Sequence, residues 1–368
     1  MGENGEVLGA GRPPIVIGGF DPMNKRVGIL TGGGDCPGLN AVIRAVVWRA
    51  TQFGDRVIGL KNGWAGLLNA DTMPLDRKMV GGILYRGGTI LGTSRTNIFK
   101  EESIAETAIK NFKKIGLDAL VAVGGEDTLG AAYKLAQRGI NVVGVPKTID
   151  NDLPGTDFTF GFDTAISIAT EAIDRLHTTA ESHNRVLVVE VMGRHAGWIA
   201  TYSGLAGGAD IILVPEHPFR VEDVCEAIRR RHDAGKFFSI VCIAEGAQMV
   251  TRKGKESVLS SKGKDAFGHV RLGGIGAVLA ERIEEITGYE TRVTVLGHIQ
   301  RGGTPTAHDR VLATRYGVEA MDCVHEQDFG VMVALQGSKI VRIPLKTVAK
   351  KIKTIDKDLY DLTKVFQY

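Results

Sequence analysis

Short, mostly apolar runs alternate along the chain with longer segments in which apolar residues recur every three or four positions. The predicted strands are residues 27–30, 117–123, 142–146, 186–191, 211–214, 239–244 and 293–296. Helical spacing follows them, for example over residues 39–47 and from about 163 to 181. Buried strands separated by helices indicate parallel sheets that are covered on both faces. Such sheets bind ligands at the carboxyl ends of their strands, where polar, glycine-rich loops lie in this chain.

The length of 368 residues predicts two α/β domains, because single cores rarely grow beyond about 250–300 residues. We predict an N-terminal extension over residues 1–25, a larger domain from 26–161 plus 300–345, a smaller domain from 162–299, and a C-terminal segment at 346–368. Residues 251–268 are rich in Lys, Gly and Ser and are predicted to form a surface loop within the smaller domain.

Composition narrows the classes of function. The chain has 45 basic and 42 acidic residues and a net charge of +3, too little for a nucleic-acid footprint. Its four cysteines lie far apart, so neither a disulfide framework nor a zinc site is expected. No apolar run approaches the ~18 residues of a membrane span, and no secretion signal is apparent. We therefore expect a cytoplasmic protein that binds neither membrane nor nucleic acid.

Two glycine-rich loops each join a predicted strand to a helix. In residues 32–35 (GGGD), backbone N–H groups could approach an anion, although a close chain turn would also require glycine. Residues 124–128 (GGEDT) place Glu126 and Asp127 at a helix start. These acids could hold Mg²⁺, or they could simply be the acidic residues that a first helical turn favours.

A third loop, residues 146–152 (PKTIDND), follows another predicted strand. In an extended loop, Asp150 and Asp152 would point the same way. Two facing carboxylates raise each other's pKa unless a cation lies between them. A general base beside a metal ion would explain the pair, and an Asx-turn is the alternative.

Two further loops carry basic residues. Arg194 follows the strand in residues 190–197 (EVMGRHAG), and it is either a ligand-binding or an ordinary surface arginine. His298 and Arg301 follow the strand in residues 296–305 (LGHIQRGGTP) and could hold a second phosphate. Taken alone, His298 would more often be a structural histidine.

The five loops together, including TIDND, VEVMGR and LGHIQRGG, resemble the phosphofructokinase family in order and spacing over residues 25–321. The resemblance implies two Rossmann-like, three-layer α/β/α domains with the active site in the interdomain cleft. It also implies Mg²⁺-dependent transfer of a phosphoryl group to O1 of fructose 6-phosphate. A P-loop motif, G-x-x-x-x-G-K-[ST], does not occur.

The resemblance assigns roles residue by residue. Asp150 matches the general base for the sugar 1-hydroxyl, Thr148 and Arg194 complete the catalytic set, and Glu126 matches the acid linked to the metal. The residues expected to bind the sugar phosphate are Thr148, Asp150, Asp152, Arg185, Met192, Gly193, Arg194, Glu245, Arg292, His298 and Arg301.

Two of these arginines imply an assembly. Arg185 and Arg292 match family arginines that reach in from a neighbouring subunit. Guanidinium groups suit phosphate because they form paired, charge-assisted hydrogen bonds. We therefore expect a homodimer or homotetramer.

The phosphoryl donor is expected at Gly34, Lys100, Asp127 and Lys147. ATP-using members of the family typically carry glycine at the positions of Asp127 and Lys147. Asp127 adds volume and negative charge where an α-phosphate would lie, whereas Lys147 adds a compact positive charge that suits pyrophosphate. The pair resembles the pyrophosphate-dependent branch, and an ATP-dependent enzyme is the alternative. Lys100 replaces a bridging arginine, and Trp64 replaces an adenine-side tyrosine.

Other departures bear on regulation and substrate. Of the basic residues at the bacterial effector site, Arg44 and Lys236 remain, whereas Trp48, His177 and Ala234 replace three others. We therefore expect a non-allosteric and, with pyrophosphate, reversible enzyme. Sedoheptulose 7-phosphate as acceptor and a non-catalytic regulatory subunit are the further alternatives.

Overall fold

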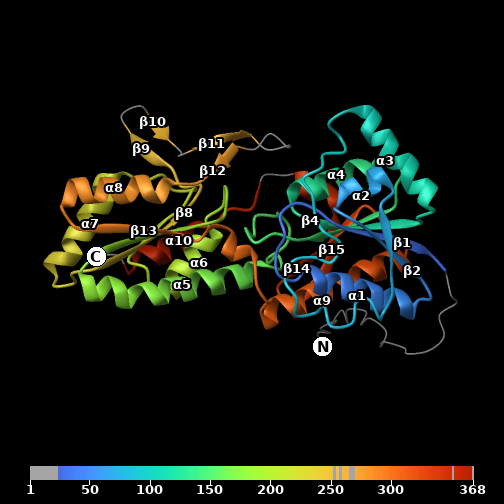
Figure 1. Ribbon diagram of the computed structural model, residues 1–368, viewed down its shortest axis with the longest axis horizontal. Helices are drawn as coiled ribbons and strands as arrows, with labels where there is room; N and C mark the ends of the chain where they lie inside the picture. Colours follow the sequence, from blue (N-terminus) through green and yellow to red (C-terminus); the bar gives the residue numbers. More distant parts are fainter. Residues whose placement is uncertain (1–23, 252–253, 257–258, 265–269, 350–351, 367–368) are drawn as a thin grey trace, which may run out of the picture.

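The computed structural model describes residues 24–366 except 252–253, 257–258, 265–269 and 350–351. Most of the predicted N-terminal extension therefore lies outside the described residues. Two α/β lobes, each built around its own sheet, lie side by side along the longest axis (Figure 1). Within the described residues, no helix combines the length and apolar character needed to cross a membrane.

The larger lobe holds a seven-stranded sheet in the order β15-β14-β5-β4-β1-β2-β3. Its strands are β1 (Arg26–Thr31), β2 (Arg56–Leu60), β3 (Thr72–Leu75), β4 (Ala119–Gly124), β5 (Val142–Pro146), β14 (Val331–Gln336) and β15 (Lys339–Pro344). The five central strands are parallel. Both edge strands, β3 and β15, are antiparallel, so the sheet is mixed rather than purely parallel.

Alternate residues of these strands face two different cores, which is why helices must cover both faces. Val27 and Ile29 pack in one apolar cluster with α1 (Leu39–Gln52) and α9 (Ala307–His325). Leu30 packs in a second cluster on the opposite face. The helices of that face are α2 (Trp64–Asn69), α3 (Glu102–Ile115) and α4 (Glu126–Ala136).

The smaller lobe repeats this plan on a parallel, four-stranded sheet in the order β13-β6-β8-β7. Its strands are β6 (Val186–Val191), β7 (Ile211–Leu213), β8 (Ser239–Ala244) and β13 (Thr291–Val295). One face carries α5 (Phe162–His183) and α6 (Trp198–Ala206), and the other carries α7 (Val221–Asp233) and α8 (Ile275–Thr287). Residues of α5 and α6 share a continuous cluster with α1 and α9, which joins the two lobes.

The segment expected to be a surface loop at residues 251–268 contains strands instead. β9 (Met249–Thr251) pairs with β10 (Gly254–Glu256), and β11 (Leu259–Lys264) pairs with β12 (Val270–Leu272), both antiparallel. These strands were not predicted, because a two-stranded ribbon is held by backbone hydrogen bonds and needs no apolar run to form. The surface position of the segment stays a prediction.

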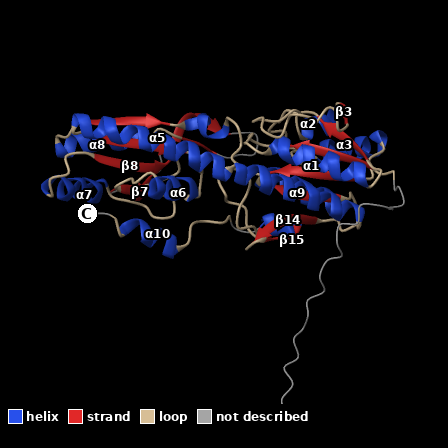
Figure 2. Ribbon diagram, turned by 90° about the horizontal axis from the view of Figure 1, so that it is seen from below, coloured by secondary structure: helices blue, strands red, loops and turns tan. Residues whose placement is uncertain are grey.

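Three connections link the lobes near their facing ends. The chain passes from β5 to α5, returns through η1 (Gly297–Arg301) to α9, and crosses once more after η2 (Leu345–Ala349) to reach α10 (Lys357–Lys364). In Figure 2, α10 lies beside α6 in the smaller lobe, far from the strands β14 and β15 that precede it. The predicted domain limits remain a prediction.

Candidate active site

The carboxyl ends of three neighbouring strands, β1, β4 and β5, open onto one cavity that faces the smaller lobe. The cavity is lined by Gly33, Gly34, Trp64, Ser94, Arg95, Thr96, Gly125, Glu126, Asp127, Thr128, Lys147, Thr148, Asp150, Asp152, Arg194 and Arg301. Segments more than a hundred residues apart thus meet in one place, because parallel strands direct all their carboxyl ends to the same edge of the sheet.

Two cations converge on the glycine loop after β1. The ammonium of Lys147 donates a hydrogen bond to the carbonyl oxygen of Gly34, and the side chain is only 3% exposed. Burial lowers the pKa of Lys147, and the nearby charge of Arg301 acts in the same direction. Arg301 donates from Nη1 to the carbonyl of Asp35 at 3.3 Å. The loop therefore presents positive charge and peptide groups to an anion.

Asp150 follows β5 in a loop that is fixed by hydrogen bonds. Its backbone N–H donates to Oγ1 of Thr148 at 3.0 Å, while Oγ1 of Thr159 donates to the carbonyl of Thr148 at 2.7 Å. Asp150 is 4% exposed, and its Oδ1 is buried without a hydrogen-bond partner among the described residues. An unpartnered buried carboxylate oxygen is costly, so a ligand group is expected to approach it.

The carboxylates of Asp152 and Glu126 act electrostatically with that of Asp150. Burial and the charge of Asp150 raise the pKa of Asp152 to about 7, and Glu126 adds to the effect while Arg194 opposes it. Glu126 and Asp127 lie in the first turn of α4, whose N-cap is the side-chain-free Gly125. Among the described residues, no three His, Cys, Asp or Glu side chains form a preformed metal cluster.

The smaller lobe brings Arg194 to the same cavity. Arg194 has a positive φ of 50°, and it is preceded by Gly193 with a φ of 138°. Its backbone N–H donates to Oε1 of Glu245 at 3.3 Å. Burial, and then the charge of Asp150, raise the pKa of Glu245 to about 7. A β-carbon added at Gly246 would lie 1.6 Å from the carbonyl of Arg194, so this turn requires glycine there.

Comparison with known proteins supplies the decisive observation. Residues 26–324 match the family described as phosphofructokinase. The chain belongs to the phosphofructokinase family. It is 59% identical, over 93% of its length and 99% of the relative's, to a Streptomyces coelicolor protein named pyrophosphate--fructose 6-phosphate 1-phosphotransferase. It is also 53% identical to ATP-dependent 6-phosphofructokinase 3 of that organism, over 90% of this chain and 96% of the relative.

A solved structure agrees with this assignment. The pyrophosphate-dependent phosphofructokinase from Marinobacter aquaeolei superposes with a TM-score of 0.77 at 25% identity, covering 93% of this chain and 91% of that chain. The predicted family and the predicted fold, two Rossmann-like, three-layer α/β/α domains, are therefore confirmed. The roles that the motifs assign to individual residues stay predictions.

Some predicted site residues of this phosphofructokinase do not line the cavity. They are Lys100, Arg185, Met192, Gly193, Glu245, Arg292 and His298. Gly193 and Glu245 nevertheless hold the Arg194 turn, and the backbone N–H of Met192 donates to Oε1 of Gln300 at 3.4 Å. Met192, Gly193 and Glu245 therefore lie at or beside the Arg194 turn rather than in the cavity wall.

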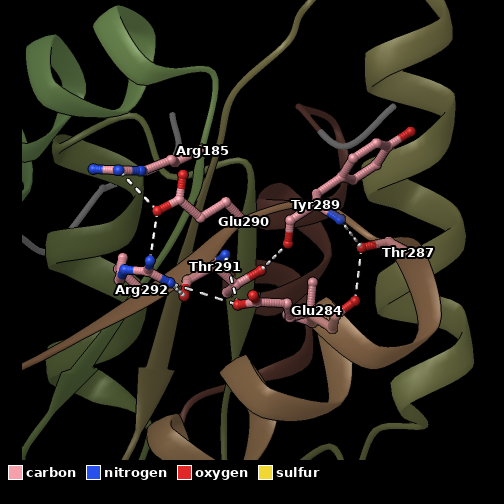
Figure 3. A network of polar contacts seen from close by, with 8 residues as sticks. Arg185, Glu284, Thr287, Tyr289, Glu290, Thr291 and Arg292 are labelled. Atoms are coloured by element: carbon pink, nitrogen blue, oxygen red, sulfur yellow. Dashed lines mark hydrogen bonds and ion pairs between the residues drawn. The ribbon is translucent and has the colours of Figure 1, made fainter.

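Arg185 and Arg292 lie together at the edge of the smaller lobe. Figure 3 shows both guanidinium groups on one carboxylate, that of Glu290. Nη2 of Arg185 is 2.8 Å, and Nη2 of Arg292 is 2.5 Å, from Oε1 of Glu290. Arg292 also lies 3.6 Å from Glu284. Both arginines are thus partly exposed, are held by Glu290 and lie outside the cavity.

Three lining residues were missed in the sequence: Ser94, Arg95 and Thr96. Their loop is fixed to the glycine loop, because Gly33 N–H donates to the carbonyl of Ser94 at 3.2 Å and Thr93 Oγ1 donates to the carbonyl of Gly33 at 2.5 Å. The only signal was a lone arginine among hydroxyl residues in a segment without apolar periodicity.

Proposed function

We propose that this phosphofructokinase transfers a phosphoryl group from pyrophosphate to O1 of D-fructose 6-phosphate, giving fructose 1,6-bisphosphate and phosphate. The observation that carries the proposal is that Asp127 and the buried Lys147 both line one cavity, which Asp150 also lines. Relatives at 53–59% identity that bear the pyrophosphate-dependent name support it. We also propose that the reaction is reversible and free of strong ADP or phosphoenolpyruvate control.

The donor preference follows from charge. A nucleotide would bring its α-phosphate toward the cavity wall that carries Asp127, and like charges within a few ångströms disfavour that complex. Pyrophosphate has no third phosphate that would have to lie beside Asp127. The buried ammonium of Lys147, already close to the glycine loop through Gly34, supplies a compact positive charge that a small, highly charged anion can use.

The proposed chemistry places Asp150 as general base for the sugar 1-hydroxyl. Its unpartnered Oδ1 can accept the proton while the hydroxyl oxygen attacks phosphorus, and Thr148 holds the backbone of Asp150 in place. Arg194 and Arg301 also line the cavity, where they would stabilise charge on the transferring group. Proximity and electrostatics are the main means by which such sites act.

The site fits Mg²⁺. This ion usually binds one or two carboxylates, several waters and substrate phosphates rather than a cluster of protein side chains. Glu126 and Asp152 both line the cavity near the unpartnered oxygen of Asp150. We propose that Glu126, with Asp152, holds Mg²⁺ together with the donor. The bound ion would offset the charge of the phosphates.

The sugar phosphate would complete its binding site across a subunit boundary, because Arg185 and Arg292 lie outside the cavity. A homodimer or homotetramer is thus proposed. Mixing Asp150→Ser subunits with Arg292→Ala subunits tests this directly. If Arg292 acts in trans, hybrids regain one intact site and activity returns. If mixing restores no activity although co-purification of differently tagged subunits demonstrates hybrids, Arg292 does not act in trans.

The second candidate is an ATP-dependent phosphofructokinase, favoured by the 53% identity to relatives of that name. The test compares pyrophosphate with ATP, using fructose 6-phosphate and Mg²⁺, for the parent and for the variant Asp127→Gly with Lys147→Gly. The proposal expects pyrophosphate activity in the parent and a gain of ATP use in the variant. The matched control, Lys61→Gly with Asp71→Gly, removes an exposed ion pair of the same residue types. A parent that prefers ATP would establish the second candidate.

A further inference from the structure

The chain after η2 forms a strap, defined here as residues 352–366, that leads from the larger lobe to the smaller one. It contains α10 (Lys357–Lys364), and its aromatic residue Tyr360 stacks on His217 with ring centroids 3.7 Å apart. Figure 2 shows α10 beneath α6. The strap begins at the loop that carries Asp150 and ends on the smaller lobe, so it contacts both sides of the candidate site.

On the larger lobe, Lys353 of the strap makes several hydrogen bonds. Its backbone N–H donates to the carbonyl of Asp152 at 2.8 Å. Its ammonium donates to the carbonyls of Thr156 at 2.9 Å and Asp157 at 2.8 Å. The same loop carries Asp150, and Lys353 therefore fixes its backbone at three points.

On the smaller lobe, Lys353 contacts the start of α6. Its carbonyl accepts a hydrogen bond from Nε1 of Trp198 at 3.0 Å, and its ammonium lies 5.0 Å from the centre of a Trp198 ring. Two residues on, the N–H of Ile355 donates to Oε1 of Glu216 at 3.1 Å. Glu216 also accepts from the N–H of Gly197 at 2.9 Å, three residues after Arg194.

Lys353 thus joins two segments that approach the cavity from opposite lobes. One ends in Asp150 and Asp152, and the other begins just after Arg194. Burial lowers the pKa of Lys353 to about 8, against the raising effects of Asp157 and Asp152. A partly buried ammonium that donates to peptide carbonyls is an unusual choice for stability alone, whereas it fixes the relative position of two backbones well.

We propose that Lys353 is a positioning residue for phosphoryl transfer: it holds the loop of Asp150 and Asp152 at a fixed distance from Arg194. The inference rests on the proposed function for its chemistry. A displacement of about 1 Å between reacting groups can lower a rate by ~10². Loss of Lys353 should therefore affect kcat much more than KM, because ground-state binding tolerates a loose loop better than the transition state does.

The test compares Lys353→Met, which keeps the apolar stem, with Lys353→Arg, which keeps the charge. The matched control is Lys357→Met, an exposed lysine of the same strap. We expect kcat to fall about 10–100-fold in Lys353→Met, with KM for both substrates changed less than threefold. We expect partial rescue in Lys353→Arg and no change in Lys357→Met. The assay uses whichever donor the parent accepts, so an error about pyrophosphate would not obscure the result.

A second measurement is independent of catalysis. Hydrogen exchange of residues 150–157 should accelerate at least tenfold in Lys353→Met, whereas β1 and β6 should keep their protection. If Lys353→Met does not fold, Trp198→Phe replaces it. That variant keeps an aromatic ring, removes the indole N–H and should lower kcat about 3–10-fold. An unchanged kcat, a loss confined to KM, or unchanged exchange at 150–157 would overturn the proposal.

Discussion

Gly34→Ala tests whether the glycine loop is shaped around Arg301. A β-carbon added at Gly34 would lie 2.1 Å from Nη1 and 2.9 Å from Cζ of Arg301. The guanidinium must retreat by more than about 1 Å to reach an ordinary contact near 3.5 Å. Gly34 does not have a positive φ, so alanine causes no backbone strain there. The flexible side chain of Arg301 moves instead, and the hydrogen bond to Asp35 is lost.

We expect kcat/KM to fall ~10²-fold, the scale that a 1 Å misplacement in a phosphoryl-transfer site produces. The midpoint of thermal unfolding should change little, because only the end of one side chain is displaced. The matched control is Gly130→Ala in α4, where an added β-carbon meets nothing within 4 Å. This control should keep full activity and gain up to ~1 kcal/mol of stability. A kcat/KM for Gly34→Ala within threefold of the parent would refute the role of Arg301.

Three further predictions follow from the site. Asp150→Ser should lower kcat by ~10²–10⁴ with fructose 6-phosphate affinity retained, and a near-normal kcat in steady-state assays would remove Asp150 from its role. The pKa of Asp152 and that of Glu245 are raised to about 7. Because both carboxyl groups hold their protons more tightly in the folded state, their contribution to the free energy of unfolding is fully present below about pH 4 and is lost as pH rises through about 7. Denaturant titrations at several pH values should give a flatter profile for Asp152→Asn, and an unaltered profile would contradict the shift. Gly246→Ala should lower the free energy of unfolding by more than ~2 kcal/mol together with activity, because the added carbon meets the backbone of Arg194 at 1.6 Å; a normal denaturation midpoint would be the opposing result.

The apolar runs along the chain were sufficient to predict the central strands. The run at residues 142–146 became β5, and the run at 186–191 became β6, with the predicted bounds. Such strands are buried on both faces, so their composition alone identifies them. The ribbons between β8 and α8 gave no such signal, because their pairing depends on backbone hydrogen bonds within a polar segment.

The motifs of the sequence also named much of the cavity lining, including Lys147, Asp150 and Arg194. These residues directly follow strands, and parallel topology then brings them together. The motifs could not indicate Arg95, since its loop is placed by hydrogen bonds to residues distant in the sequence, such as Gly33. Nor could they place Lys100 and His298, which the fold leaves outside the cavity.

The sequence by itself thus determined the family, the alternation of strands and helices, and the residues that carry the proposed chemistry, because these depend on local pattern and chain order. Only the tertiary structure decided which charges are buried, which oxygen of Asp150 lacks a partner, and where the strap with Lys353 lies. The partners of Lys353 are carbonyls about two hundred residues away in the chain. Any residue type can offer such a carbonyl, so no sequence pattern identifies the contact.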